Sequence, residues 1–209
     1  MVQTQVPRQQ DGWHAAAEGT RAQFIALEGL SAVGKSTVAP LLAQQLGASL
    51  VETLLPSFDD VRVQVDQSRL VMARLHFWTM CNYAVSELVR AELAQSRDVV
   101  VESYFYRTLA THAAMGATHL PEVDWDRAIH PDVTVLLTLD EPCRRLRLAE
   151  RELSGSLSYW SRLEESNVAV TRRTYESFNL TTLDTTGLDK AEVARRLAKL
   201  AGATEARHG

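Results

Sequence analysis

The sequence has little of what marks several large classes of protein. Its two cysteines, Cys81 and Cys143, lie far apart and show no metal-ligand spacing, so we expect reduced thiols in a cytoplasmic protein. No apolar run approaches the ~20 residues that a membrane-spanning helix needs. The N-terminus has no charged head followed by an apolar stretch, so no secretion signal is recognised.

An excess of positive charge is also absent. The chain has 22 Lys and Arg against 26 Asp and Glu, which gives a formal net charge of −4. A protein that binds a nucleic-acid backbone needs a clustered excess of Lys and Arg. We therefore expect no nucleic-acid partner and no membrane partner, and instead a small molecule.

The 209 residues fit one domain of ordinary globular composition, with 45% hydrophobic and 23% charged residues. Residues 1–20 are polar and aperiodic, which indicates a loose leader. We predict that the domain covers residues 21–203.

Short apolar runs alternate with helical patterns along this domain. Strands are indicated at 23–28, 48–52, 98–102, 133–139 and 180–184, of which 23–28, 98–102 and 133–139 are continuous apolar runs typical of buried strands. Apolar residues recur at helical spacing in 36–46, 69–96, 106–115, 142–152, 159–178 and 189–201. Strands that alternate with helices form right-handed βαβ units. The sequence therefore predicts an α/β fold with a five-stranded parallel sheet flanked by helices.

The strongest motif begins at Gly29 and fits G-x-x-x-x-G-K-[ST]. It follows a predicted strand and opens a predicted helix, which is the context that a phosphate-binding loop requires. Glycine allows close approach of the backbone, and successive N–H groups at a helix N-terminus bind anions. The residues predicted to hold ATP are Gly29, Ser31, Ala32, Val33, Gly34, Lys35, Ser36 and Thr37.

Three residues are predicted to carry the chemistry at this loop. Lys35 is expected to reach the β- and γ-phosphates, and the Ser36 hydroxyl is expected to bind Mg²⁺. Glu102 ends a buried strand at the sheet edge where such folds bind ligands. A carboxylate there holds magnesium through water or accepts the proton of an acceptor. The predicted cofactors are therefore ATP and Mg²⁺, with Ser36 and Glu102 at the metal.

Arginines crowd one predicted helix before a Ser-Gly-Ser break. Guanidinium groups match phosphate oxygens, so a mobile lid over residues 144–158 is one interpretation. Arg147 and Arg151 share a helix face and are the predicted catalytic pair, while Arg144 is predicted to contact ATP. The alternative is a solvated basic face that pairs with nearby glutamates.

Taken together, these segments resemble the thymidylate kinases and deoxynucleoside kinases. The resemblance rests on Phe24-Ile-Ala-Leu-Glu-Gly29 before Gly34-Lys-Ser-Thr37, Asp98-Val-Val-Val-Glu102, Pro131 to Asp140, and Leu183-Asp-Thr-Thr186. It covers residues 24–200. It implies a P-loop kinase fold with a helical lid over ATP, an acceptor pocket walled by the long middle helix, and a homodimer.

The resemblance also implies roles on the acceptor side. Deoxynucleoside kinases use a glutamate as general base at about the distance of Glu52, although whether Glu52 or Glu102 is the base stays open. The base-stacking aromatic residue of thymidylate kinases falls near Trp78, and their helix arginine falls at Asn82. The alternative for Trp78 is that it packs in the core. Tyr104 is a further expected wall of the acceptor pocket.

The chain departs from both families where they hold phosphate. Ser31 and Ala32 stand where thymidylate kinases carry an aspartate, and Ser103 stands where both families place an arginine after the acidic residue. The next arginine is Arg107, one helical turn further, and it is a candidate substitute. The pattern leans towards a neutral hydroxyl acceptor, or towards an unusual nucleotide held by Arg74, Arg107 or the lid.

We therefore predict an ATP-dependent phosphotransferase of the thymidylate kinase-like type. It would transfer the γ-phosphate to a nucleoside, a nucleoside monophosphate or a related small molecule. The alternative is a regulatory P-loop NTPase that hydrolyses ATP as a switch. The guanine-reading Asn-Lys-x-Asp of GTPases is absent from the sequence.

Overall fold

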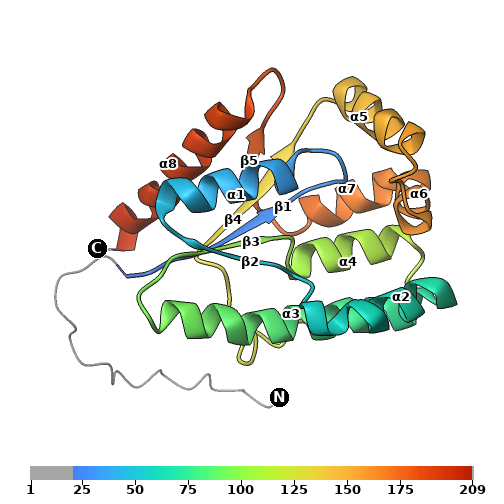
Figure 1. Cartoon of the computed structure of the whole chain (residues 1–209), viewed down its shortest axis with the longest axis horizontal. Helices are drawn as coiled ribbons and strands as arrows, with labels where there is room; N and C mark the ends of the chain where they lie inside the picture. Colours follow the sequence, from blue (N-terminus) through green and yellow to red (C-terminus); the bar gives the residue numbers. More distant parts are fainter. Residues whose placement is uncertain (1–20, 209) are drawn as a thin grey trace, which may run out of the picture.

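The computed structural model describes residues 21–208, and the predicted leader at 1–20 lies outside them (Figure 1). Five parallel strands form one sheet in the order β2-β3-β1-β4-β5, which confirms the predicted fold class. The strands are β1 (Phe24–Glu28), β2 (Ser49–Val51), β3 (Val99–Glu102), β4 (Val133–Thr138) and β5 (Thr181–Asp184).

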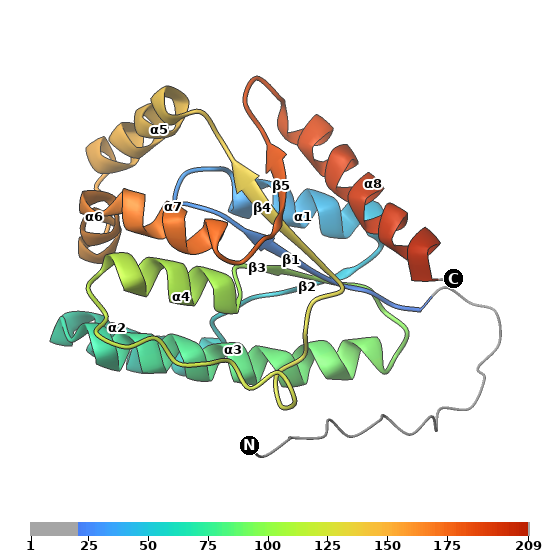
Figure 2. The same ribbon diagram turned by 180° about the vertical axis from the view of Figure 1, so that it is seen from behind.

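Helices cover both faces of the sheet and one of its ends. They are α1 (Lys35–Leu46), the 3₁₀ turn η1 (Pro56–Phe58), α2 (Asp59–Ser68), α3 (Val71–Leu93), α4 (Phe105–Ala114), α5 (Glu141–Leu153), α6 (Tyr159–Ser166), α7 (Val168–Glu176) and α8 (Lys190–His208). Helices α1 and α8 lie on the face seen in Figure 1, and α4 and α7 lie on the face seen in Figure 2. Helices α5 and α6 stand beyond the carboxyl ends of the strands.

Three helical segments differ from the sequence-based expectation. Helix α2 was not predicted, because none of its residues is buried and it therefore has no apolar stripe. The helix predicted over 159–178 is two helices, because Asn167 has φ −129° and ψ 30°, outside the helical region. Helix α8 continues to residue 208 instead of ending near 201.

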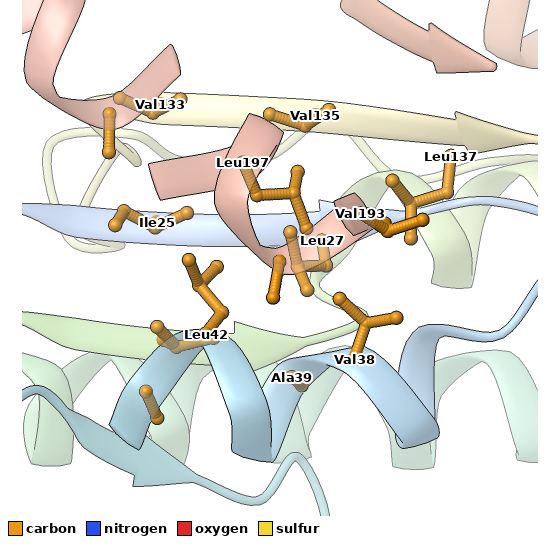
Figure 3. Packing of buried hydrophobic residues seen from close by; sticks show 14 of the residues in the cluster. Ile25, Leu27, Val38, Ala39, Leu42, Val133, Val135, Leu137, Val193 and Leu197 are labelled. Carbon is orange, nitrogen blue, oxygen red and sulfur yellow. The ribbon is translucent and has the colours of Figure 1, made fainter. Parts of the chain in front are cut away.

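The central strand β1 explains where the core sits. All five of its residues are buried, because β3 and β4 flank it and helices cover both faces. Ile25 and Leu27 point towards α1 and α8, where Leu42 and Leu197 meet them (Figure 3). The alternate residues of β1 pack into a second cluster with α3 and α4. The core thus fixes the loop that follows β1 relative to α1.

We expect Leu42→Ala to lower the free energy of unfolding by about 2–5 kcal/mol, because it leaves a cavity between α1 and β1. The matched control is Leu146→Ala, since the Leu146 side chain on α5 is 63% exposed. This change should stay within about 0.5 kcal/mol of the parent protein. Urea denaturation measures both values, and equal effects of the two changes would contradict this packing.

Candidate active site

The phosphate loop leaves β1 and enters α1 in a backbone shape that only glycine allows at its first position. Gly29 has φ +142°, and a Cβ atom there would lie 2.5 Å from the carbonyl oxygen of Leu137 on β4. Gly34 has φ +105° and precedes the first residue of α1. The loop therefore directs backbone N–H groups at a helix N-terminus, which fits a nucleotide phosphate.

The Lys35 side chain lies over this loop and is buried. Its Nζ atom donates to the carbonyl oxygens of Gly29 at 2.9 Å and of Leu30 at 3.1 Å. Burial, with the neighbouring Arg107 guanidinium, lowers the pKa of Lys35 to about 8, although nearby carboxylates oppose the shift. Lys35 is therefore a cation at neutral pH and stands where a phosphate would bind.

Ser36 and Glu102 meet at the predicted metal position. The Ser36 hydroxyl donates to Glu102 Oε1 at 2.7 Å, and Thr53 fixes the turn by donating to the carbonyl oxygens of Glu102 and Ser103 at 2.7 and 2.6 Å. Among the described residues, no group of three or more His, Cys, Asp or Glu could hold a metal ion. Mg²⁺ in phosphoryl-transfer sites uses one or two carboxylates together with substrate phosphates. The donor pair of Ser36 and Glu102 fits that requirement.

Glu28, the last residue of β1, is a site residue that the sequence reasoning missed. It is fully buried and accepts hydrogen bonds from the Tyr104 backbone N–H at 2.9 Å and the Tyr175 hydroxyl at 3.3 Å. Burial raises the pKa of Glu28 to about 7, against the opposing effects of these bonds and of Lys35. The available signal was a charged residue that ends a fully buried strand directly before the phosphate loop.

A cavity of about 510 Å³ lies beside Ser36 and Glu102, and we call it the α3–α6 pocket. Of the residues predicted on the acceptor side, it brings together Glu52, Trp78 and Arg107. Residues of the pocket that the sequence reasoning did not place there include His112, Trp160 and Glu164. Trp160 and Glu164 share α6 at i, i+4 spacing, and His112 comes from α4, so only tertiary packing brings the two helices to one pocket.

Two residues predicted to bind the acceptor lie outside this pocket. Asn82 is buried in α3, where its Nδ2 atom donates to Thr108 Oγ1 at 2.9 Å. The Tyr104 ring is buried among aromatic residues, and its hydroxyl bonds to Ser86 and to the carbonyl oxygen of Ile129. Both positions favour a structural role, because the polar groups of these side chains are held inside the core.

Arg74 lines the α3–α6 pocket beside two tryptophans, Trp78 and Trp160. It donates to Asp66 Oδ1 at 2.9 Å and to His112 Nε2 at 3.0 Å. Its guanidinium carbon lies 4.8 Å from the ring centre of Trp160 and 5.5 Å from that of Trp78. The indole N–H groups of these two tryptophans are buried and have no partner among the described residues. The pocket is therefore lined by aromatic surface beside Arg74.

A second cavity of about 450 Å³, the α5–α8 pocket, lies on the other side of the phosphate loop. The loop residues Ala32 to Gly34 line it with Thr37, Arg147 and Arg151, so the structure brings these predicted residues together. Arg147 Nη1 donates to the carbonyl oxygen of Ala32 at 3.2 Å.

Arg144 is placed differently from the expectation that it contacts ATP. Its side chain is buried, and its guanidinium group lies between the carboxylates of Glu141 and Glu165 at 2.6–3.0 Å. It lines neither of the two pockets. Because both carboxylates occupy its donors, Arg144 connects α5 to α6 and has no free donor group directed at an ATP site.

No family model and no curated protein matches the sequence. Among solved structures, the chain is similar to the thymidylate kinase from Candida albicans, with a TM-score of 0.66 and 18% sequence identity. The similarity covers 88% of this chain and 94% of that one. The chain has the thymidylate kinase fold. In this chain Lys35 and Ser36 open α1 directly after β1, at the carboxyl edge of the sheet.

Within residues 21–208, no helix combines the length and the apolarity that crossing a bilayer requires. The longest helix of the described chain, α3, instead uses its apolar residues to pack against β3 and to wall the α3–α6 pocket.

We expect stability to fall on acidification because of His112. Burial, with the Arg74 charge, lowers the pKa of His112 to about 3 in the folded protein, against about 6.5 when unfolded. Its stabilising contribution is therefore complete above pH 6.5 and is lost as pH falls towards 3, by about 1.4 kcal/mol per pH unit. Urea denaturation between about pH 7 and pH 5 measures this slope. His112→Gln should reduce it, whereas the exposed control His76→Gln should not; equal slopes in all three proteins would contradict the assignment.

Proposed function

We propose that this protein is an ATP-dependent phosphotransferase that moves the γ-phosphate of ATP to a nucleoside, a nucleoside monophosphate or a related small acceptor. The observation that carries the proposal is the pair of pockets on opposite sides of one phosphate loop. Gly34 and Thr37 line the α5–α8 pocket, while Ser36 lines the α3–α6 pocket. A donor and an acceptor bound in these pockets would meet at Ser36 and Lys35. A protein that only hydrolyses ATP needs no second pocket of this kind.

The donor side follows from the same geometry. ATP would place its phosphates on the loop and its remaining part in the α5–α8 pocket, with Lys35 on the β- and γ-phosphates. Ser36 and Glu102 would hold Mg²⁺, which neutralises charge on the phosphate oxygens. We further propose that residues 144–158 act as a lid that brings Arg147 and Arg151 to the transferring group.

The acceptor side is the α3–α6 pocket. Trp78, Trp160 and Arg74 would bind the body of the acceptor, and its reactive end would lie towards Glu52 and Glu102. We include residues 21–203 in the kinase domain. The homodimer and the cytoplasmic location rest on the sequence resemblance and composition alone.

ADP release from ATP and Mg²⁺ tests the proposal when it is followed with and without acceptors. The panel holds the nucleosides, their 5′-monophosphates and a control without acceptor. We expect one class of acceptor to stimulate ADP release strongly, and Lys35→Ala to lower that rate by on the order of 10²–10³-fold. Lys199→Ala is the matched control, because Lys199 is exposed on α8 and lines neither pocket.

Two results would overturn the proposal. One is a flat panel in which only slow hydrolysis occurs whatever acceptor is added. The other is acceptor-dependent turnover that Lys35→Ala leaves intact, because a P-loop kinase cannot transfer phosphate efficiently without that cation. Hydrolysis that depends on a protein partner instead of an acceptor would favour the regulatory switch.

A further inference from the structure

The guanidinium group of Arg107 in the α3–α6 pocket is already occupied. Both of its terminal nitrogens bind the Glu164 carboxylate, each at 2.8 Å, as a bidentate pair. The same nitrogens also donate to the carbonyl oxygen of Gly29 at 3.1 Å and to Ser31 Oγ at 3.0 Å. Four N–H groups are thereby used, so a phosphate can reach these nitrogens only if Glu164 leaves.

Displacing Glu164 is unfavourable. Its side chain is 1% exposed, on α6, and it also accepts from Ser31 Oγ at 3.3 Å. A bidentate carboxylate–guanidinium pair is among the strongest hydrogen-bonded pairs in proteins. If a phosphate took Arg107, the buried Glu164 charge would lose its partner, which costs far more than breaking an exposed pair.

Three carboxylates, those of Glu52, Glu102 and Glu164, line the pocket. The buried Lys35 nearby is assigned to the phosphates of ATP, and Arg74, the other lining arginine, already pairs with Asp66 at 2.9 Å. A dianionic phosphate ester placed at the reactive end would therefore face carboxylates, whereas an uncharged hydroxyl group would not.

We propose that Glu164 is a specificity-determining residue, which by occupying Arg107 excludes phosphate esters and restricts the acceptor to a neutral hydroxyl. This inference rests on the proposed kinase function. It differs from what the fold alone suggests, because the solved neighbour is named as a thymidylate kinase.

The proposed reaction transfers the γ-phosphate of ATP to the hydroxyl group of the acceptor. The acceptor oxygen attacks the γ-phosphorus and forms an O–P bond, while the bond from the γ-phosphorus to the β,γ-bridging oxygen breaks. ADP leaves with that electron pair, and the hydroxyl proton passes to Glu52. The Glu52 carboxylate is exposed at the pocket, and no residue of the described chain donates a hydrogen bond to it. Its oxygens are therefore available as a general base.

The test compares each nucleoside with its own 5′-monophosphate, starting with thymidine and thymidine 5′-monophosphate. In the unchanged protein we expect kcat/KM for the nucleoside to exceed that for the monophosphate by at least about tenfold. Glu164→Gln should shift this ratio towards the monophosphate by at least about tenfold, because the Arg107 charge becomes available to phosphate.

The matched control is Glu165→Gln. It removes the neighbouring carboxylate of α6, which pairs with Arg144 and does not line the pocket. The acceptor ratio should stay at its unchanged value in this variant. A shift of equal size in both variants would overturn the role of Glu164, since the effect would then come from α6 as a whole.

A second variant keeps the proposal testable if Glu164→Gln does not fold. Glu52→Gln changes an exposed side chain, and it should lower kcat for the hydroxyl acceptor by on the order of 10²-fold or more. An unchanged kcat would contradict a hydroxyl acceptor, because a phosphate acceptor is already anionic and needs no base.

The outcomes separate the two proposals. A preference for monophosphates that depends on Lys35 would leave the kinase function intact and overturn the role of Glu164. A flat panel would overturn the kinase function, and the role of Glu164 would fall with it.

Discussion

A carboxyl group buried at the end of β1 connects the segments that carry the site. Glu28 accepts from the backbone of Tyr104, which follows β3, and from the hydroxyl of Tyr175 on α7. Tyr175 also bonds to Gly29, the first residue of the phosphate loop. A buried carboxyl group without such partners would be destabilising, so the burial of Glu28 depends on these contacts. The position of the loop relative to β3 and α7 therefore follows from the burial of one side chain.

Charges of both signs alternate around the loop for the same reason. Lys35 and Arg107 are buried cations, and Glu28, Glu102 and Glu164 are the carboxylates whose charges favour the protonated Lys35. Each charge is tolerated in the interior because its neighbours have the opposite sign. The network thereby keeps Lys35 charged at neutral pH although burial lowers its pKa. It also means that a change in any one carboxylate alters the electrostatic surroundings of the others.

The sequence is enough to predict those parts of the structure that follow local rules. It does not predict the parts that depend on tertiary packing. Strands buried on both faces give continuous apolar runs, and the phosphate loop has a fixed motif, so the sheet and Lys35 were found. The exposed helix α2 has no apolar stripe to reveal it. Glu164 and His112 lie on helices far apart in sequence and meet only through tertiary packing, so no spacing rule identifies them. Helical periodicity groups Arg144 with the other arginines of its helix. It does not show that Glu141, on the same helix, pairs with Arg144.

The position of one arginine connects the fold to the chemistry of the acceptor. The kinases that the sequence resembles place an arginine directly after the acidic residue of the third strand, where this chain has Ser103 in a left-handed conformation with φ +70°. The guanidinium group instead comes from Arg107, in the first turn of α4. From there it donates to Gly29 and Ser31 of the phosphate loop. The same nitrogens bind the carboxylate of Glu164 on α6. If the proposed function holds, the turn that supplies this cation would decide whether the acceptor site binds phosphate or is lined by carboxylates.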